Sequence, residues 1–216
     1  MPVLRLPILA LAALALAVPA SAQDADATEI EPTSVLVIED VPTYSAGMGR
    51  TDGPFTLISL DGAVVVAPDA AARADSASGV WDIGIRGTEV ILNGGTSGPG
   101  GRRGRLLPTA LGPDATVTGP LGTMPMDGDG ECPRGEPRVV CHGSGNGWYE
   151  YAGNGVEPLD RTLLVERPDG ATFAVRFVRY VLGDALPSGV RPRYVTLEAS
   201  PVTVVDAPAI PPVEQR

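Results

Sequence analysis

Short stretches rich in apolar residues, some of them alternating with polar ones, recur along the chain after residue 34. Such stretches, separated by turn residues at regular spacing, are typical of half-buried β-strands. In one of them the side chains of Trp81, Ile83 and Ile85 share a face of the predicted strand. The pattern predicts strands at Val35–Ile38, Phe55–Ser59, Val64–Val66, Val80–Arg86, Glu89–Leu92, Trp148–Tyr151, Thr162–Glu166, Thr172–Val181, Tyr194–Leu197 and Val202–Val205.

Turn residues join several of these strands into hairpins. Asp61-Gly62, Gly87-Thr88 and Pro168-Asp169-Gly170 each lie between two predicted strands, where glycine accepts the positive φ of a tight turn. The sequence therefore predicts a mostly-β protein with one antiparallel domain, sandwich-like or barrel-like, and little helix. One or two helical turns at Pro68–Asp75 are the only helix expected after the N-terminus.

The N-terminus has the pattern of a secretory signal. Arg5 precedes the apolar run Leu6–Val18, and Ala20-Ser21-Ala22 places small residues where a signal peptidase reads them. We expect cleavage after Ala22, so that residues 1–22 are a signal peptide. Residues 23–33 would be a disordered lead-in, 34–206 the domain and 207–216 a flexible tail.

Two features of this signal argue against a membrane anchor. The apolar run is too short to cross about 30 Å of hydrocarbon comfortably. No cysteine that could carry a lipid lies near the cleavage site. We therefore expect a soluble exported protein, periplasmic or extracellular.

Residues 93–147 interrupt the strand pattern. Fifteen of these 55 residues are glycine, and apolar alternation almost vanishes. A segment of this length without strands in a compact domain is usually functional or disordered. Cys132 and Cys141 lie in its second half, and in an exported protein we expect them to form a disulfide. A metal site that uses both thiols and His142 is the alternative.

The charged residues exclude several kinds of function. The formal net charge is −10 and all 16 basic residues are arginine, which argues against binding nucleic acid or anionic membranes. Without lysine there is no Walker-type loop, Schiff base or Ser-Lys pair. With one histidine and no GxSxG motif, a hydrolytic triad would need an unusual base. We expect no enzymatic activity; a glycosidase with two carboxylates is the remaining enzyme alternative.

Three segments carry a resemblance to a known family: WDIGIRGTEVILNGGTSGPGG (Trp81–Gly101), GNGWYEY (Gly145–Tyr151) and RTLLVERPDGATFAVRFVRYVL (Arg161–Leu182). Together they resemble the HmuY-like family of exported haem-binding proteins, over roughly Phe55–Tyr194. The resemblance implies the family's β fold and non-catalytic capture of haem or porphyrin for iron acquisition. The implied partners are haem, a haem-carrying protein or an outer-membrane receptor. Many relatives are lipid-anchored, and this chain departs from them in that respect.

The haem interpretation assigns candidate residues. Haem iron takes histidine, methionine, cysteine or tyrosinate as axial ligands, and the candidates here are His142, Met124 and Met126. The family's best-known pattern uses two histidines, one of them just after the strand that matches GWYEY. Ala152-Gly153-Asn154 stands there, and the chain has no second histidine. A histidine–methionine pair and a methionine pair both stay open. The pocket candidates are Trp148, Tyr149 and Tyr151, with Arg102, Arg103 and Arg105 for the propionates.

Each candidate also has a plainer interpretation. The histidine can be an unliganded loop residue, the methionines packing, the aromatic residues core, and the arginines a solvated loop. Asp127, Asp129 and Glu131 alternate like a crude calcium loop but lack the spacing of an EF-hand. The alternative to haem capture is therefore a haem-free structural or protein-interaction module with the same fold.

Overall fold

The computed structural model describes one compact unit of the chain, within Pro32–Arg216. The residues described are 35–43, 53–61, 64–67, 77–119, 121–133, 135–153, 155–185 and 191–205. They form thirteen strands and no helix, which confirms the expected mostly-β fold. The predicted signal peptide, lead-in, tail and helical turns at Pro68–Asp75 lie outside the described residues.

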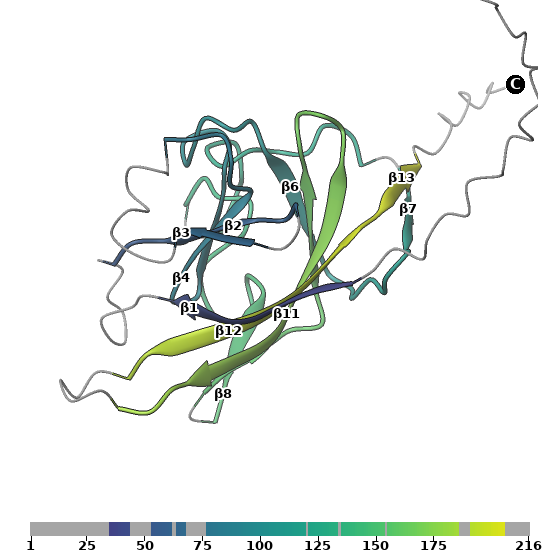
Figure 1. Ribbon diagram of the computed structural model, residues 1–216. Coiled ribbons are helices and arrows are strands. Elements are labelled where there is room, and N and C mark those ends of the chain that lie inside the picture. Colours follow the sequence, from purple (N-terminus) through teal and green to yellow (C-terminus); the bar gives the residue numbers. More distant parts are fainter. Residues whose placement is uncertain are drawn as a thin grey trace, which may run out of the picture. The chain divides into compact units, whose positions relative to one another are not determined.

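Two sheets make up most of the described fold. The first has five antiparallel strands in the order β1 (Leu36–Thr43), β12 (Arg193–Pro201), β11 (Thr172–Leu182), β10 (Thr162–Glu166) and β6 (Arg103–Leu107). Figure 1 shows β1, β12 and β11 side by side. The second sheet has the order β3 (Val64–Ala67), β2 (Thr56–Ser59), β4 (Ile83–Arg86) and β5 (Glu89–Leu92).

Two pairs of short strands complete the fold. β8 (Tyr149–Ala152) and β9 (Gly155–Pro158) form an antiparallel hairpin. β7 (Thr116–Thr118) pairs in parallel with β13 (Thr203–Val205). The second pair connects the middle of the glycine-rich segment to the last described strand of the chain.

The two main sheets bury a common core, in the manner of a β-sandwich. Alternate residues of β1, β10, β11 and β12 meet those of β2, β4 and β5 in one central cluster. Trp148 and Tyr149 close this cluster at the start of β8, and the Trp148 ring stacks on Phe177 with centroids 4.4 Å apart. Burial of these apolar side chains supplies the main favourable free energy of folding.

The predicted hairpins are confirmed. β10 pairs with β11, β4 with β5, and β2 with β3, each in antiparallel register. Val35–Ile38 was expected as a short strand, and β1 is longer because its pairing with β12 resumes at Val41 after a bulge. Asp40, in that bulge, has a φ of 49°, which a local break in the strand permits.

β4 corrects the expectation of a half-buried strand. Ile83 faces the central cluster, but Gly84 on the opposite face is buried as well. A Cβ added at Gly84 would lie 2.9 Å from Cγ1 of Ile91. Leu57 and Ile91 form a second cluster with Trp81 on this face, so Trp81 does not share the cluster of Ile83. Glycine gave no apolar signal, although its small size is what lets the second face pack.

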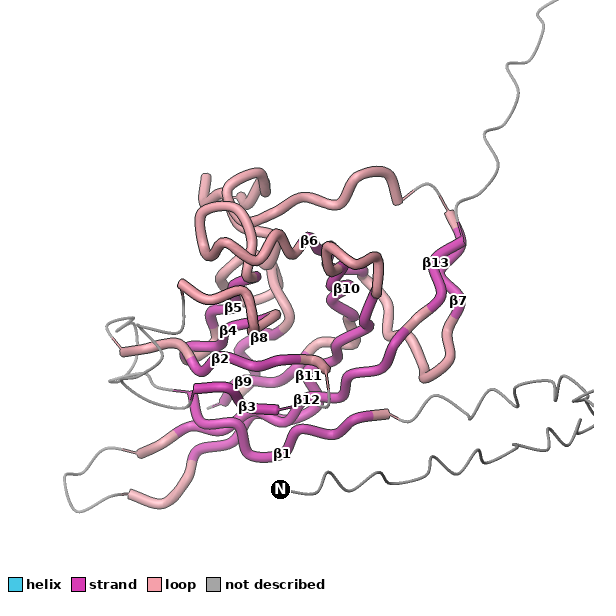
Figure 2. The backbone as a smooth tube through the Cα atoms, turned by 45° about the horizontal axis from the view of Figure 1, so that its top comes forward, coloured by secondary structure: helices cyan, strands magenta, loops and turns pink. Residues whose placement is uncertain are grey.

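The glycine-rich segment also differs from the expectation, because it contains β6 and β7 among loops that are pink in Figure 2. β6 has the sequence RGRLL, which lacks strict apolar alternation. At Gly104 an added Cβ would lie 2.7 Å from the Leu164 carbonyl oxygen and 2.7 Å from Cδ1 of Leu92. Glycine is therefore required for the close approach of β6 to its neighbours. Because glycine is not counted as apolar, the hydrophobicity pattern did not predict this strand.

Candidate functional site

One pocket among the described residues lies between β6 and the segment that contains the two cysteines. It has a volume of about 360 Å³ and opens to solvent. This volume falls within the range of small-molecule sites, about 300–1,000 Å³. Its wall combines arginine with aliphatic side chains: Gly104, Arg105, Leu106, Leu107, Pro108, Pro125, Gly130, Glu131, Arg138, Val139, Cys141, Asn146 and Arg161.

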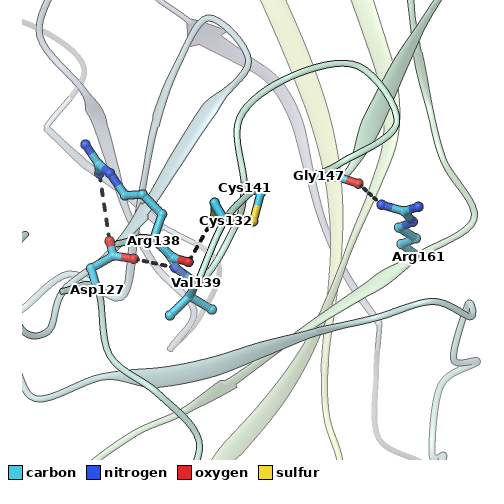
Figure 3. The surroundings of a disulfide bond; sticks show 7 residues. All are labelled: Asp127, Cys132, Arg138, Val139, Cys141, Gly147 and Arg161. Atoms are coloured by element: carbon cyan, nitrogen blue, oxygen red, sulfur yellow. Dashed lines mark hydrogen bonds and ion pairs between the residues drawn. A yellow bond between two sulfur atoms is a disulfide. The ribbon is translucent and has the colours of Figure 1, made fainter. Parts of the chain in front are cut away.

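Cys141, one half of a disulfide, lines this pocket. Cys132 and Cys141 are bonded, with Cα atoms 5.3 Å apart, as the sequence predicted (Figure 3). Gly147 approaches the same turn so closely that an added Cβ would lie 2.2 Å from the Cys141 carbonyl oxygen. The disulfide and this backbone contact hold the pocket wall where the chain has little apolar sequence to pack.

Asp127 attaches the disulfide segment to the second sheet. Its carboxylate is fully buried and accepts a hydrogen bond from the Leu92 amide at 2.9 Å and from the Val139 amide at 3.0 Å. The Arg138 guanidinium lies 3.9 Å from the same carboxylate and 2.9 Å from that of Glu89. Figure 3 shows Asp127, Arg138 and Val139 together beside the disulfide. Asp127 therefore has a structural role, and the calcium-loop interpretation of this run loses the first of its three carboxylates.

Three arginines line the pocket, and their partners differ. Arg138 is neutralised by Glu89 and Asp127. Arg161 donates from Nη1 to the Gly147 carbonyl at 2.5 Å but has no carboxylate partner among the described residues. Arg105 makes neither a hydrogen bond nor an ion pair with a described side chain. Arg105 and Arg161 thus line the pocket without a described carboxylate partner, in a protein whose net charge is −10.

The three consecutive arginine candidates separate in the structure. Arg102 is 7% exposed and pairs with buried Asp82, away from the pocket. Arg103 donates to the Met124 carbonyl at 3.0 Å and is not part of the pocket wall. Only Arg105 lines the pocket. Arg103 and Arg105 are two positions apart on β6 and share a face of the strand, whereas Arg102 precedes the strand and pairs with Asp82, so the three do not form one basic loop.

Met124 lies on the face of the first sheet that points away from the central cluster, and Met126 lies beside the glycine loop. Met124 is 3% exposed and packs in a third cluster with Leu164 and Ala174. Leu163, the neighbour of Leu164 on β10, belongs to the central cluster, so the two clusters lie on opposite faces of this sheet. Met126 is half-buried next to Gly95. Neither methionine side chain forms part of the pocket wall.

His142, Tyr149 and Tyr151 form a group that is separate from the methionines. Nε2 of His142 lies 3.4 Å from Oγ1 of Thr88, and its ring centroid lies 6.4 Å from that of Tyr149. Tyr149 is fully buried, whereas Tyr151 is 62% exposed with its ring 5.4 Å from Tyr149. Trp148 donates from Nε1 to the Thr88 carbonyl at 3.0 Å. The structure does not bring His142 and Met124 together.

Two tyrosine hydroxyls near this group, those of Tyr149 and Tyr180, are buried without a hydrogen-bond partner among the described residues. Burial raises the pKa of Tyr149 above its ordinary value of 10.0, because the phenolate is poorly solvated there. Burial likewise raises the pKa of Tyr180, against the opposing charge of Arg193. Both side chains therefore stay neutral over the physiological pH range.

Sequence reasoning missed Arg161, Arg138 and the aliphatic wall residues. Arg161 precedes β10 and is 56 positions from Arg105, so no spacing in the sequence connects them. Both line one pocket because β10 pairs with β6, which places the start of β10 beside the end of β6. Only a strand predicted at RGRLL (Arg103–Leu107) and paired with Thr162–Glu166 would have placed Arg105 near Arg161.

Comparison with known proteins gives no family: no family model matches the chain, and no curated protein matches it. Within the described ranges, no helix is long and apolar enough to cross a membrane. The same ranges contain no group of three or more His, Cys, Asp or Glu side chains placed to hold a metal ion.

Proposed function

We propose that this protein is an exported, non-catalytic binding protein for haem or a related porphyrin. The observation that carries the proposal is the pocket beside the disulfide, where Arg105 and Arg161 lie next to an aliphatic wall. A porphyrin has an apolar ring and two carboxylates, and such a wall suits both parts. The resemblance of Trp81–Gly101 and the two later segments to haem-binding proteins supports the same ligand.

Titration of the mature protein with haem tests this function. Binding should change the Soret band and saturate near one equivalent at micromolar protein. Glu131→Trp should weaken binding, because Glu131 lines the pocket and the larger side chain would occupy it. Asp129→Trp is the matched control, since Asp129 is exposed, also loses one negative charge and lies outside the wall. An unchanged spectrum with haem would refute the function.

A haem-free interaction module is the second candidate. Its support is three exposed apolar side chains, Tyr151 on β8 and Val178 and Leu182 on β11, which are 62%, 37% and 50% exposed. Exposed apolar groups of this kind can take part in a protein contact. The haem titration separates the two candidates, because an interaction module with a lost pocket function would leave the haem spectrum unchanged.

Export is part of the proposed function. The disulfide supports an oxidising compartment, and the Ala20-Ser21-Ala22 site predicts a mature N-terminus at Gln23 without lipid. Intact mass and N-terminal sequencing of protein recovered from the periplasm or medium would check this. A retained leader or an acylated terminus would contradict it.

A further inference from the structure

Two arginines in the pocket wall, Arg105 and Arg161, have no carboxylate partner among the residues that the structure describes. The chain has 26 acidic residues against 16 arginines, so an arginine that meets no acid is unexpected on charge grounds. Arg105 and Arg161 are both half-buried and both line the pocket. Glu131 also lines it, but this residue is exposed and forms no ion pair with either arginine. The pocket therefore presents positive charge to any ligand that enters.

The free edge of β6 adds a backbone donor. Gly104 donates its amide to the Pro125 carbonyl at 2.9 Å, which places the Gly104 amide on the side away from β10. Antiparallel pairing alternates, so Leu106, two residues later, turns its amide to that same side. Pro125 and Leu106 both line the pocket, and the Leu106 amide has no partner among the described residues. The Leu106 amide is thus a hydrogen-bond donor on the same pocket wall as the two arginines.

Three donors of this kind favour a carboxylate. A guanidinium group binds a carboxylate with two parallel hydrogen bonds, and a backbone amide adds a third donor. The rest of the wall is aliphatic, with Leu107 and Val139 among its members, so a small hydrated anion would leave apolar surface uncovered. The chemical class that fits is an amphipathic carboxylate.

The wall lacks the histidine, methionine, tyrosine or free thiol that haem iron takes as an axial ligand. Cys141 lines it, but its sulfur is in the disulfide. His142, the next residue, lies with its ring beside Thr88 and outside the wall. Met124 is buried in a different cluster. An iron atom in the pocket would therefore meet no axial ligand from the described wall residues.

We infer that Arg105, Arg161 and the Leu106 amide form a carboxylate-binding site that holds a porphyrin by its propionates, independently of iron. This inference rests on the proposed function and specifies how the same pocket selects its ligand. Metal-free protoporphyrin should bind as tightly as haem, and loss of the carboxylate charge should weaken binding.

Titration with three porphyrins tests the inference. The mature protein is titrated with haem, metal-free protoporphyrin and the dimethyl ester of protoporphyrin, followed by absorbance and quenching of tryptophan fluorescence. The affinities for haem and metal-free protoporphyrin should agree within about threefold. The ester should bind about tenfold or more weakly, which corresponds to the loss of one hydrogen bond to a charged group. Binding of haem alone would overturn the inference and leave the proposed function standing. Failure of all three ligands would overturn both.

Variants locate the site. Arg105→Gln and Arg161→Gln should each weaken metal-free protoporphyrin about tenfold and leave the ester unchanged. Arg191→Gln is the matched control, because Arg191 is exposed and outside the wall. The urea midpoint of each variant shows whether the fold is retained, and Arg105→Gln is the cleaner test because this side chain holds no described neighbour. Equal affinity of the Arg105→Gln variant and the control for protoporphyrin would refute this site.

Discussion

Arg102 donates from Nε to Oδ1 of Asp82 over 2.8 Å, and both side chains are buried. The other oxygen of Asp82 accepts the Leu60 amide at 2.8 Å, and Arg102 also donates to the Gly100 carbonyl at 2.6 Å. The side chain of Asn93 bonds the Trp81 carbonyl and the Gly100 amide. The tryptophan-strand and glycine-loop motif is thus a structural unit that joins β4, β5 and the start of β6.

Replacement of Asp82 by Asn should destabilise the fold strongly. It leaves the buried Arg102 without a counter-charge, and removal of one partner of a buried pair lowers the free energy of unfolding by about 3–5 kcal/mol. Urea unfolding followed by tryptophan fluorescence measures this. Glu198→Gln is the control, because its pair with Arg176 is about one-third exposed on both sides and should contribute less than about 1 kcal/mol. Similar losses in both variants would contradict the structural role of Asp82.

The glycine loop is sensitive to added volume. A Cβ at Gly94 would lie 2.1 Å from the Arg102 carbonyl oxygen, so Gly94→Ala must displace backbone. We expect a loss of about 1–3 kcal/mol or more, in the range of overpacked cores. Gly79→Ala meets no atom within 4 Å and should leave stability unchanged or raise it by up to about 1 kcal/mol. Thermal unfolding of the two variants compares them, and a tolerated Gly94→Ala would contradict the tight loop.

Loss of the disulfide should weaken both the fold and the pocket. The Cys132→Ser/Cys141→Ser variant frees a loop whose cysteines are nine residues apart, which corresponds to about 2–3 kcal/mol of unfolded-state entropy. Because Cys141 lines the pocket, protoporphyrin affinity should fall as well. Urea unfolding and the fluorescence titration measure the two effects. Free thiols in the exported wild-type protein, found by titration under denaturing conditions without reductant, would contradict the disulfide.

Tyr149 should make the fold sensitive to alkaline pH. Its pKa is raised by burial in the folded state, whereas the unfolded chain loses the proton near 10.0. Above that pH the folded state binds more protons than the unfolded state, so stability is present below pH 10.0 and falls as the pH rises toward the folded pKa. Unfolding free energies measured across this window check the sign.

Tyr149→Phe separates this effect from general alkaline unfolding. The variant removes a buried hydroxyl that lacks a partner among the described residues, so it should be neutral or stabilising near pH 7. Its stability should then decline less steeply above pH 10.0 than that of the wild type. Tyr151→Phe, at the exposed neighbouring position, is the control. A large loss of stability at pH 7 in Tyr149→Phe would show that its hydroxyl has a partner.

The sequence by itself determined the strands whose apolar stretches are bounded by clear turn residues. Thr162–Glu166 and Thr172–Val181 flank a Pro-Asp-Gly turn, and β10 and β11 match them within one residue. Apolar stretches and turn residues are local properties of the chain, so they predict a strand wherever that strand packs. The disulfide was predictable for a similar reason, since the signal at the N-terminus predicts the compartment and only two cysteines are present.

Only the tertiary structure decided where the candidate site lies. The β6–β10 register brings Arg105 and Arg161 to the same pocket. The sequence pattern did not predict β6, because glycine occupies its most closely packed position, Gly104. Tertiary packing likewise separated Arg102 from Arg105 and placed Met124 and Tyr149 on opposite faces of one sheet. Adjacent positions in a strand point to opposite sides, and distant strands bring their ends together. Closeness in the sequence therefore did not predict which side chains share a pocket.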